Sequence, residues 1–297
     1  MKRVKIEKDA SAVEIKGENK MFGLRLISWI ILVGLCFGAL LLKENGKYIL
    51  LVMFVFGAFM ATHEIMSMLE KLKYKSFKKA GAFCAALSVV FVFYGVPKYN
   101  LVPLVLLVIG CWAYLLICKE KEENLKKIAV SIGGTLLGLL PIFFLSKIYH
   151  YDNGGMDMSI GAKFVLYVVA VTKIGDTFAY ITGMLSNKIL KGKNHKIVPS
   201  ISPKKSWEGT IGGMIFSAIT SCVLWYYVFD AQALLVPLIA GIVLFWGGFF
   251  GDLAESALKR TCGVKDSGGI LPGMGGVCDL LDSFIFNAPL FYFCILL

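Results

Sequence analysis

Nine runs of apolar residues, each about as long as a lipid bilayer is thick, occupy most of this chain of 297 residues. A transmembrane helix needs about 20 consecutive, predominantly apolar residues. The runs lie near 24–42, 48–69, 80–97, 101–118, 128–148, 160–185, 210–229, 231–254 and 277–297. They leave little chain for a soluble domain, so the sequence predicts an all-α, polytopic membrane protein with about nine transmembrane helices.

Composition and charge support this fold class. Charged residues make up 17% of the chain, against about 25% in soluble domains, and the mean hydropathy is +0.73. Lysines and arginines exceed the acids by 11. In so apolar a chain, a basic excess indicates cytoplasmic loops facing anionic lipids and does not indicate binding to nucleic acid.

The distribution of lysine and arginine predicts the orientation. With a cytoplasmic N-terminus, 25 of the 31 basic residues fall in cytoplasmic segments, five fall in outside segments, and Lys173 lies within a span. The positive-inside rule therefore predicts a cytoplasmic N-terminus and an outside C-terminus. We expect three regions: a polar cytoplasmic arm at 1–23, an N-terminal transmembrane region of about five helices at 24–158, and a C-terminal transmembrane region of about four helices at 159–297.

Ionisable residues inside the predicted spans are functional candidates, because charge is costly within a bilayer. They are His63 and Glu64, Lys173 and Asp176, Asp252 and Glu255, and Asp279 and Asp282. We expect the first two to form a buried polar pair between helices. The acids from Asp176 onward fall toward the cytoplasmic ends of their helices, and the last two acid pairs have the i,i+3 spacing of one helix face.

Two predicted cytoplasmic loops, 186–209 and 255–276, bring lysines and glycines next to these acids. Carboxylates hold Mg²⁺, while lysine, arginine and backbone N–H groups hold phosphate. The glycine-rich loop 268–276 leads into a helix beginning near Val277, whose free N–H groups we expect to form an anion site. Ser202 and Pro203 are typical of a helix N-cap and the first helical position. The pattern indicates a phosphate-binding site beside the carboxylates.

Three blocks of the C-terminal half resemble the signature of the CDP-diacylglycerol synthases, also called phosphatidate cytidylyltransferases. They are GDTFAY at 175–180 with ISPKKSWEG at 201–209, then GDLAES at 251–256, and finally the segment 256–282. That segment follows the family pattern S-x-x-K-R, K-D, P-x-H-G-G and D-R-x-D, but has Met274 in place of the usual His and Leu280 in place of the usual Arg. We therefore assign no catalytic role to these two positions.

The resemblance implies transfer of the cytidylyl group of CTP to phosphatidic acid, which gives CDP-diacylglycerol and pyrophosphate. It also implies Mg²⁺, with room for a second cation. The implied catalytic residues are Asp252, Asp279, Asp282, Lys259 and Arg260. The three aspartates are the implied metal ligands, with Asp176 and Asp266 as further candidates. The implied substrate-binding residues are Ser202, Lys204, Lys205, Glu208, Lys265, Gly275 and Gly276.

The implied partners are CTP, phosphatidic acid, membrane lipids and a second copy of the chain in a homodimer. The implied location is the inner membrane of a bacterium, with the active site facing the cytoplasm. No general base is required, because a phosphate monoester is already ionised at pH 7.

Three alternatives remain open at this point. A CTP-dependent polyprenol or lipid kinase, or a cytidylyltransferase for another lipid phosphate, would also need lysine-rich loops and intramembrane aspartates. A membrane transporter is a more remote alternative. Transporters commonly bind their substrates near the bilayer midplane between repeated halves, whereas this chain has no internal repeat and its acids gather at one end of the spans.

Overall fold

The computed structural model describes residues 43–94, 99–151, 158–229, 232–271, 273 and 275–296, together with Gly34 and Gly38. The predicted arm at 1–23 lies outside the described residues, as does the first predicted span at 24–42 apart from those two glycines. The described elements are α2 (Lys43–Glu70), α3 (Lys78–Phe93), α4 (Val102–Ile117), α5 (Lys121–Tyr149), α6 (Met158–Ile189), β1 (Lys196–Val198), β2 (Ser202–Ser206), α7 (Trp207–Phe229), α8 (Leu235–Thr261), α9 (Val277–Leu281) and α10 (Phe284–Ile295).

The helices confirm the predicted class of a polytopic, predominantly helical membrane protein. Within the described part of the chain, α2, α5, α6, α7 and α8 are long and apolar enough to cross a membrane, and α4 and α10 are shorter apolar helices. One hydrophobic core joins both halves of the chain, since Ile142 of α5 packs in the same cluster as Val168 of α6 and Phe291 of α10. The total of nine spans and the domain boundary near 158 stay predictions.

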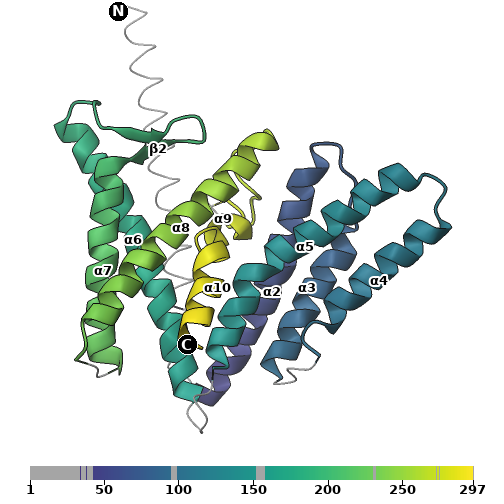
Figure 1. The fold of residues 1–297 in the computed structure, drawn as a ribbon, viewed down its shortest axis with the longest axis horizontal. Coiled ribbons are helices and arrows are strands. Elements are labelled where there is room, and N and C mark those ends of the chain that lie inside the picture. Colours follow the sequence, from purple (N-terminus) through teal and green to yellow (C-terminus); the bar gives the residue numbers. More distant parts are fainter. Residues whose placement is uncertain are drawn as a thin grey trace, which may run out of the picture.

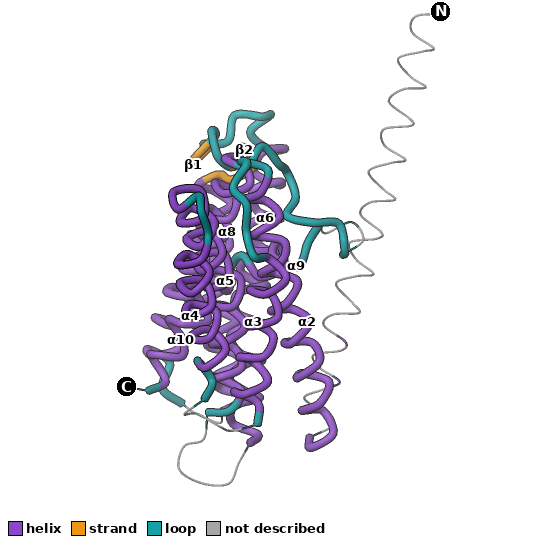
Figure 2. Tube along the Cα trace, turned by 90° about the vertical axis from the view of Figure 1, so that its right-hand side faces the viewer, coloured by secondary structure: helices purple, strands orange, loops and turns teal. Residues whose placement is uncertain are grey.

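The connections predicted to be cytoplasmic lie toward one end of the bundle. The α2–α3 turn, the α4–α5 turn, the β1–β2 hairpin and the C-terminal end of α8 all lie toward the upper side of Figure 1, whereas α10 ends at the opposite side. Figure 2 shows the hairpin above the helix ends. Most lysines of the described loops belong to this end. Which side of the membrane this end faces stays a prediction.

The segment predicted to begin the seventh helix forms a strand instead. Residues Ser202–Ser206 pair antiparallel with β1, with Lys196 opposite Ser206 and Val198 opposite Ser202. The helix begins at Trp207, and the true N-cap is Ser206, whose hydroxyl oxygen accepts a hydrogen bond from the Gly209 N–H at 3.3 Å. The prediction chose the wrong serine, because Pro at the second position fits a hairpin edge as well as a helix start.

The last predicted span, 277–297, is also divided. Helix α9 has only five residues, and α10 begins after a break at Asp282 and Ser283. At this break the carboxylate of Asp282 accepts a hydrogen bond from the Ser283 N–H at 2.5 Å, a local bond that competes with helical pairing. The break packs against Gly251 of α8, where an added Cβ would overlap the carbonyl oxygen of Asp282. A glycine at 251 is therefore what lets the two segments meet.

Close packing of α6 and α7 also depends on glycines, because Gly209 and Gly213 lie one turn apart on the same face of α7. A Cβ at Gly209 would lie 2.6 Å from the carbonyl oxygen of Ala179, and one at Gly213 would lie 2.8 Å from that of Gly175. This contact brings the start of α7 and the strand before it against the polar face of α6.

Candidate active site

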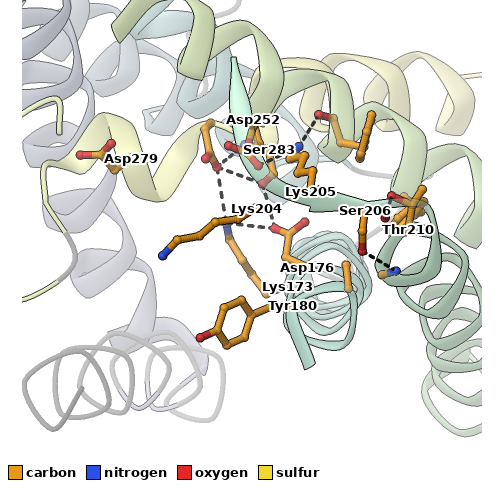
Figure 3. A pocket seen from close by; sticks show the side chains of 16 residues that line it. Lys173, Asp176, Tyr180, Lys204, Lys205, Ser206, Thr210, Asp252, Asp279 and Ser283 are labelled. Atoms are coloured by element: carbon orange, nitrogen blue, oxygen red, sulfur yellow. Dashed lines mark hydrogen bonds and ion pairs between the residues drawn. The ribbon is translucent and has the colours of Figure 1, made fainter. Parts of the chain in front are cut away.

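A cavity of about 320 Å³ lies where α6, α7, α8 and the α9–α10 break meet beneath strand β2. Figure 3 shows its side chains converging from these elements. The polar residues that line it are Lys173, Asp176, Tyr180, Ser202, Lys204, Lys205, Ser206, Thr210, Asp252, Asp279, Asp282 and Ser283. Three lysines and four aspartates among them leave one negative charge in excess.

Two of the lining aspartates and the buried Glu255, which does not line the cavity, form what we call the acidic cluster: Asp252, Glu255 and Asp282. Their oxygens lie within 4.8 Å of one another. Glu255 is only 2% exposed, and among the described residues no hydrogen-bond donor reaches its Oε1. The sequence places Asp279 in this group, whereas the structure brings Glu255 to Asp252 and Asp282.

Three lysines pair with this cluster: Lys259 contacts Glu255, and the other two line the cavity. The ammonium group of Lys205 lies 2.8 Å from Asp252 and donates to the Phe249 carbonyl at 3.1 Å. The ammonium group of Lys173 lies 3.6 Å from Asp176 and 3.8 Å from Asp282. Strand geometry separates Lys205 from Lys204, because neighbouring side chains point to opposite faces.

Lys204 is the exposed cation of the cavity. It lines the cavity wall, and within the described chain it forms no ion pair. Figure 3 shows its ammonium group pointing away from Lys205. It is therefore available to an anionic ligand without first breaking an internal contact.

Figure 3 shows Asp279 apart from Asp252, and the carboxylate of Asp279 holds the glycine-rich loop. Its Oδ1 accepts a hydrogen bond from the Lys259 ammonium at 2.6 Å. Its Oδ2 accepts from the Gly276 N–H at 2.7 Å and the Ser267 N–H at 2.9 Å. Lys259 also pairs with Glu255, so it links this anchor to the acidic cluster.

The predicted anion site at the start of the helix near Val277 is wrong, because protein carboxylates fill it. Glu64 of α2 accepts hydrogen bonds from the Val277 N–H at 3.1 Å and the Cys278 N–H at 2.9 Å. Of the expected buried polar pair, Glu64 is buried and bonds across to α9, whereas His63 is only half-buried. The His63 ring instead stacks on Phe59, with 6.3 Å between ring centroids.

The glycine-rich loop does permit the close approach that its composition predicts, but to carboxylates of the protein. Gly275 has a φ of +95°, in the left-handed region, and a Cβ there would overlap Asp279. Leu271 and Gly275 bond to each other across the loop. Met274 lies outside the described residues, and Leu280 is half-buried on α9.

The remaining predicted residues lie outside the cavity lining. Arg260 is exposed and bonds to the Val264 carbonyl at 3.5 Å. Lys265 and Asp266 are exposed in the loop. Glu208 bonds to the His195 ring at 2.8 Å and so braces the hairpin against α7. The catalytic role of Arg260 and the substrate or metal roles of the other three residues stay predictions.

Sequence reasoning names Glu255 and Lys173 as intramembrane charges but assigns them no role. The sequence does carry a signal for both, which is helical spacing. Glu255 lies four residues before Lys259, and Lys173 lies three residues before Asp176, so each pair shares a helix face. The apolar walls of Phe245 and Phe249 carry no signal in the sequence, since aromatic residues in a span are ordinary.

The donor chemistry of the acidic cluster fits Mg²⁺. Hard carboxylate oxygens from two or three side chains, with space left for phosphate oxygens, are what this ion uses in nucleotide-binding sites. The free Oε1 of Glu255 and the negative excess of the cavity favour a divalent cation here.

Fold and site together define a polytopic helical membrane protein with a carboxylate- and lysine-lined cavity at one end of its bundle. The chain belongs to the cytidylyltransferase family, whose sequence model matches residues 23–297. This confirms the resemblance carried by the three blocks of motifs.

Three curated relatives show the same likeness. A phosphatidate cytidylyltransferase of Staphylococcus saprophyticus is 46% identical over 132 residues, which are 44% of this chain and 48% of that protein. One from Staphylococcus aureus (strain COL) is 42% identical over 132 residues, with the same two shares. The uncharacterized protein YnbB of Escherichia coli (strain K12) is 40% identical over 135 residues, 46% of this chain and 43% of that protein. The matched segment thus spans about half the length of these relatives.

Proposed function

We propose that this protein transfers the cytidylyl group of CTP to phosphatidic acid, with Mg²⁺ held by Asp252, Glu255 and Asp282. The observation that carries the proposal is the meeting of Asp252 and Asp282 of the acidic cluster with Lys204 and Lys205 in one cavity, in a chain of the cytidylyltransferase family. The names of the staphylococcal relatives support phosphatidic acid as the acceptor.

The reaction brings two polyanions together, so most of the catalysis is charge neutralisation and positioning. An oxygen of the lipid phosphate forms a bond to the α-phosphorus of CTP, and the bond from that phosphorus to the bridging oxygen breaks to release pyrophosphate. Bound Mg²⁺ supplies positive charge to the phosphate oxygens. The protein needs no general base, because the attacking phosphate is already ionised.

The three lysines of the cavity bind phosphate in different ways, which follow from their positions. Lys204 is unpaired and binds the triphosphate first. Lys205 and Lys173 pair with Asp252 and Asp282, two of the carboxylates that would hold Mg²⁺, and so they lie where they can also donate to the phosphates. Phe245 and Phe249 form an apolar wall that keeps water from competing with the lipid phosphate. A cavity of about 320 Å³ suits the polar groups, so the acyl chains remain in the bilayer.

Labelled CTP tests the proposal. Purified protein is given Mg²⁺, one acceptor at a time (phosphatidic acid, polyprenol or polyprenol phosphate) and either [α-³²P]CTP or [γ-³²P]CTP. We expect lipid-bound label from the α-position only. Label from the γ-position only would show a lipid kinase, and label transferred to polyprenol phosphate but not to phosphatidic acid would show a different acceptor.

Membrane location, orientation and assembly form the rest of the proposal. CTP is a cytosolic nucleotide, so the end of the bundle that carries the hairpin faces the cytoplasm, and a bacterial inner membrane is the location. A homodimer stays a prediction that cross-linking in native membranes can test.

A further inference from the structure

Glu64 is a buried carboxylate of the N-terminal half that lies beneath the glycine-rich loop. It is 4% exposed, and both of its oxygens accept hydrogen bonds. Besides the Val277 and Cys278 N–H groups, the Ser267 hydroxyl lies 3.1 Å from its Oε2. These partners are 203 to 214 residues away in sequence. Glu64 is thus a direct polar tie from the first half of the chain to the segment that precedes Asp279 and Asp282.

The loop is shaped around this carboxylate. A Cβ at Gly268 would lie 2.5 Å from Oε1 of Glu64, and one at Gly276 would lie 2.6 Å from its carboxyl carbon. Both distances are too short for any other residue without movement of the loop or of Glu64. Gly268 and Gly276 therefore allow the loop backbone to pack directly against the Glu64 carboxylate.

A series of contacts links Glu64 to the acidic cluster. The Ser267 hydroxyl lies between Oε2 of Glu64 and Oδ2 of Asp279, at 3.1 and 2.8 Å. Asp279 in turn bonds to Lys259, which pairs with Glu255 of the acidic cluster. Asp282 lies three residues after Asp279. The position of α9 along the bundle therefore determines where the Asp282 carboxylate meets Asp252 and Glu255.

The same interface has an apolar part that does not need Glu64. Ile65 and Met68 of α2 pack with Cys262 and Cys278. Helix α2 and α9 would therefore stay in contact if the carboxylate were lost. The carboxylate adds orientation. Because hydrogen bonds are directional, the two N–H groups that donate to Glu64 fix how α9 is rotated about its axis and how far it lies along α2.

We propose that Glu64 is a positioning residue for nucleotidyl transfer, acting through α9 to place Asp279 and Asp282. Its effect on the reaction rests on the proposed function, whereas its hold on the loop does not. The N-terminal half would thus contribute a residue that positions the active site, although Glu64 itself does not line the cavity.

The first measurement is hydrogen–deuterium exchange of peptides that cover 264–283, in the full-length protein in nanodiscs. Glu64→Gln keeps the size of the side chain but replaces one acceptor oxygen by an NH₂ donor. We expect the amides of this segment to exchange at least about tenfold faster than in wild type. The matched control is Glu70→Gln, the same change on the same helix, where Glu70 bonds to Lys78 at 2.7 Å and not to the loop. This control leaves the exchange of 264–283 unchanged.

The second measurement is steady-state kinetics of folded, monodisperse protein with [α-³²P]CTP and phosphatidic acid. We expect Glu64→Gln to lower kcat by about 10- to 100-fold, the cost of a misplacement near 1 Å, while KM for CTP changes less than about threefold. A purely structural role would instead lower the yield of folded protein and leave the kcat of the folded fraction unchanged. If Glu64→Gln does not fold, Ser267→Ala removes the shared hydroxyl and shifts exchange and kcat in the same directions by a smaller factor.

The outcomes separate this inference from the proposed function. Faster exchange together with a lower kcat supports the positioning role. Unchanged exchange overturns it, and so does faster exchange with a kcat within about threefold of wild type. If wild type forms no labelled lipid, the proposed function fails, while the exchange data still decide whether Glu64 holds the loop.

Discussion

Replacing Gly251 by alanine would separate the two segments that build the acidic cluster. Gly251 precedes Asp252 on α8 and faces the α9–α10 break. An added Cβ would overlap the carbonyl oxygen of Asp282 and would lie 3.2 Å from both its carbonyl carbon and the Cα of Ser283. These are backbone atoms, so no side-chain rotation can relieve the overlap.

The size of the effect follows from that geometry. To regain van der Waals contact, α8 has to retreat from the break by about 1 Å, because packed interiors hold no spare volume. Overpacking of this kind costs about 1–3 kcal/mol of stability. Moving Asp252 away from Asp282 by the same distance is expected to lower kcat by about 100-fold.

The assay compares kcat with thermal unfolding of the purified protein in detergent. Gly133→Ala is the matched control, since a Cβ at Gly133 on α5 meets nothing within 4 Å. We expect this control to keep wild-type kcat and to gain slightly in stability, as alanine favours helix. A Gly251→Ala protein with wild-type kcat would refute the assignment of the reaction to the acidic cluster.

Three further substitutions test separate parts of the site. Asp252→Asn removes one oxygen donor of the acidic cluster, so the Mg²⁺ concentration for half-maximal activity should rise at least about tenfold; an unchanged Mg²⁺ titration would place the metal elsewhere. Lys204→Met removes the unpaired cation, and we expect KM for CTP to rise about tenfold with little change in kcat. Equal KM values would exclude Lys204 from CTP binding. Ser206→Ala deletes the N-cap of α7 and should cost about 1 kcal/mol in chemical denaturation, whereas Ser206→Thr should cost less; equal losses for the two variants would contradict the cap.

Most helices could be predicted from the sequence because a span is a long, continuous signal. A run of 20 apolar residues leaves few alternatives to a helix, and the lysines mark one end of the bundle. The hairpin could not be predicted in this way. Its strands have three and five residues, and Ser202 with Pro203 fits a helix start equally well.

The candidate site shows the same limit more sharply. Sequence spacing places Asp279 and Asp282 on one helix face, but the helix is interrupted at Asp282. Asp279 holds the glycine-rich loop, whereas Asp282 belongs to the acidic cluster. Glu64 could not be linked to Val277, because 213 residues separate them and the contact is to backbone N–H groups that no motif records. Local patterns therefore identify the chemical groups, whereas tertiary packing decides which of them meet.

The most direct test of cytidylyl transfer is the ratio of its two products. Purified protein is incubated with CTP, Mg²⁺ and phosphatidic acid in mixed micelles, and pyrophosphate and cytidylyl lipid are measured in the same sample. We predict one pyrophosphate for each cytidylyl lipid, with neither product formed when phosphatidic acid is left out. Pyrophosphate released without lipid, or CDP formed in place of pyrophosphate, would contradict the proposed reaction.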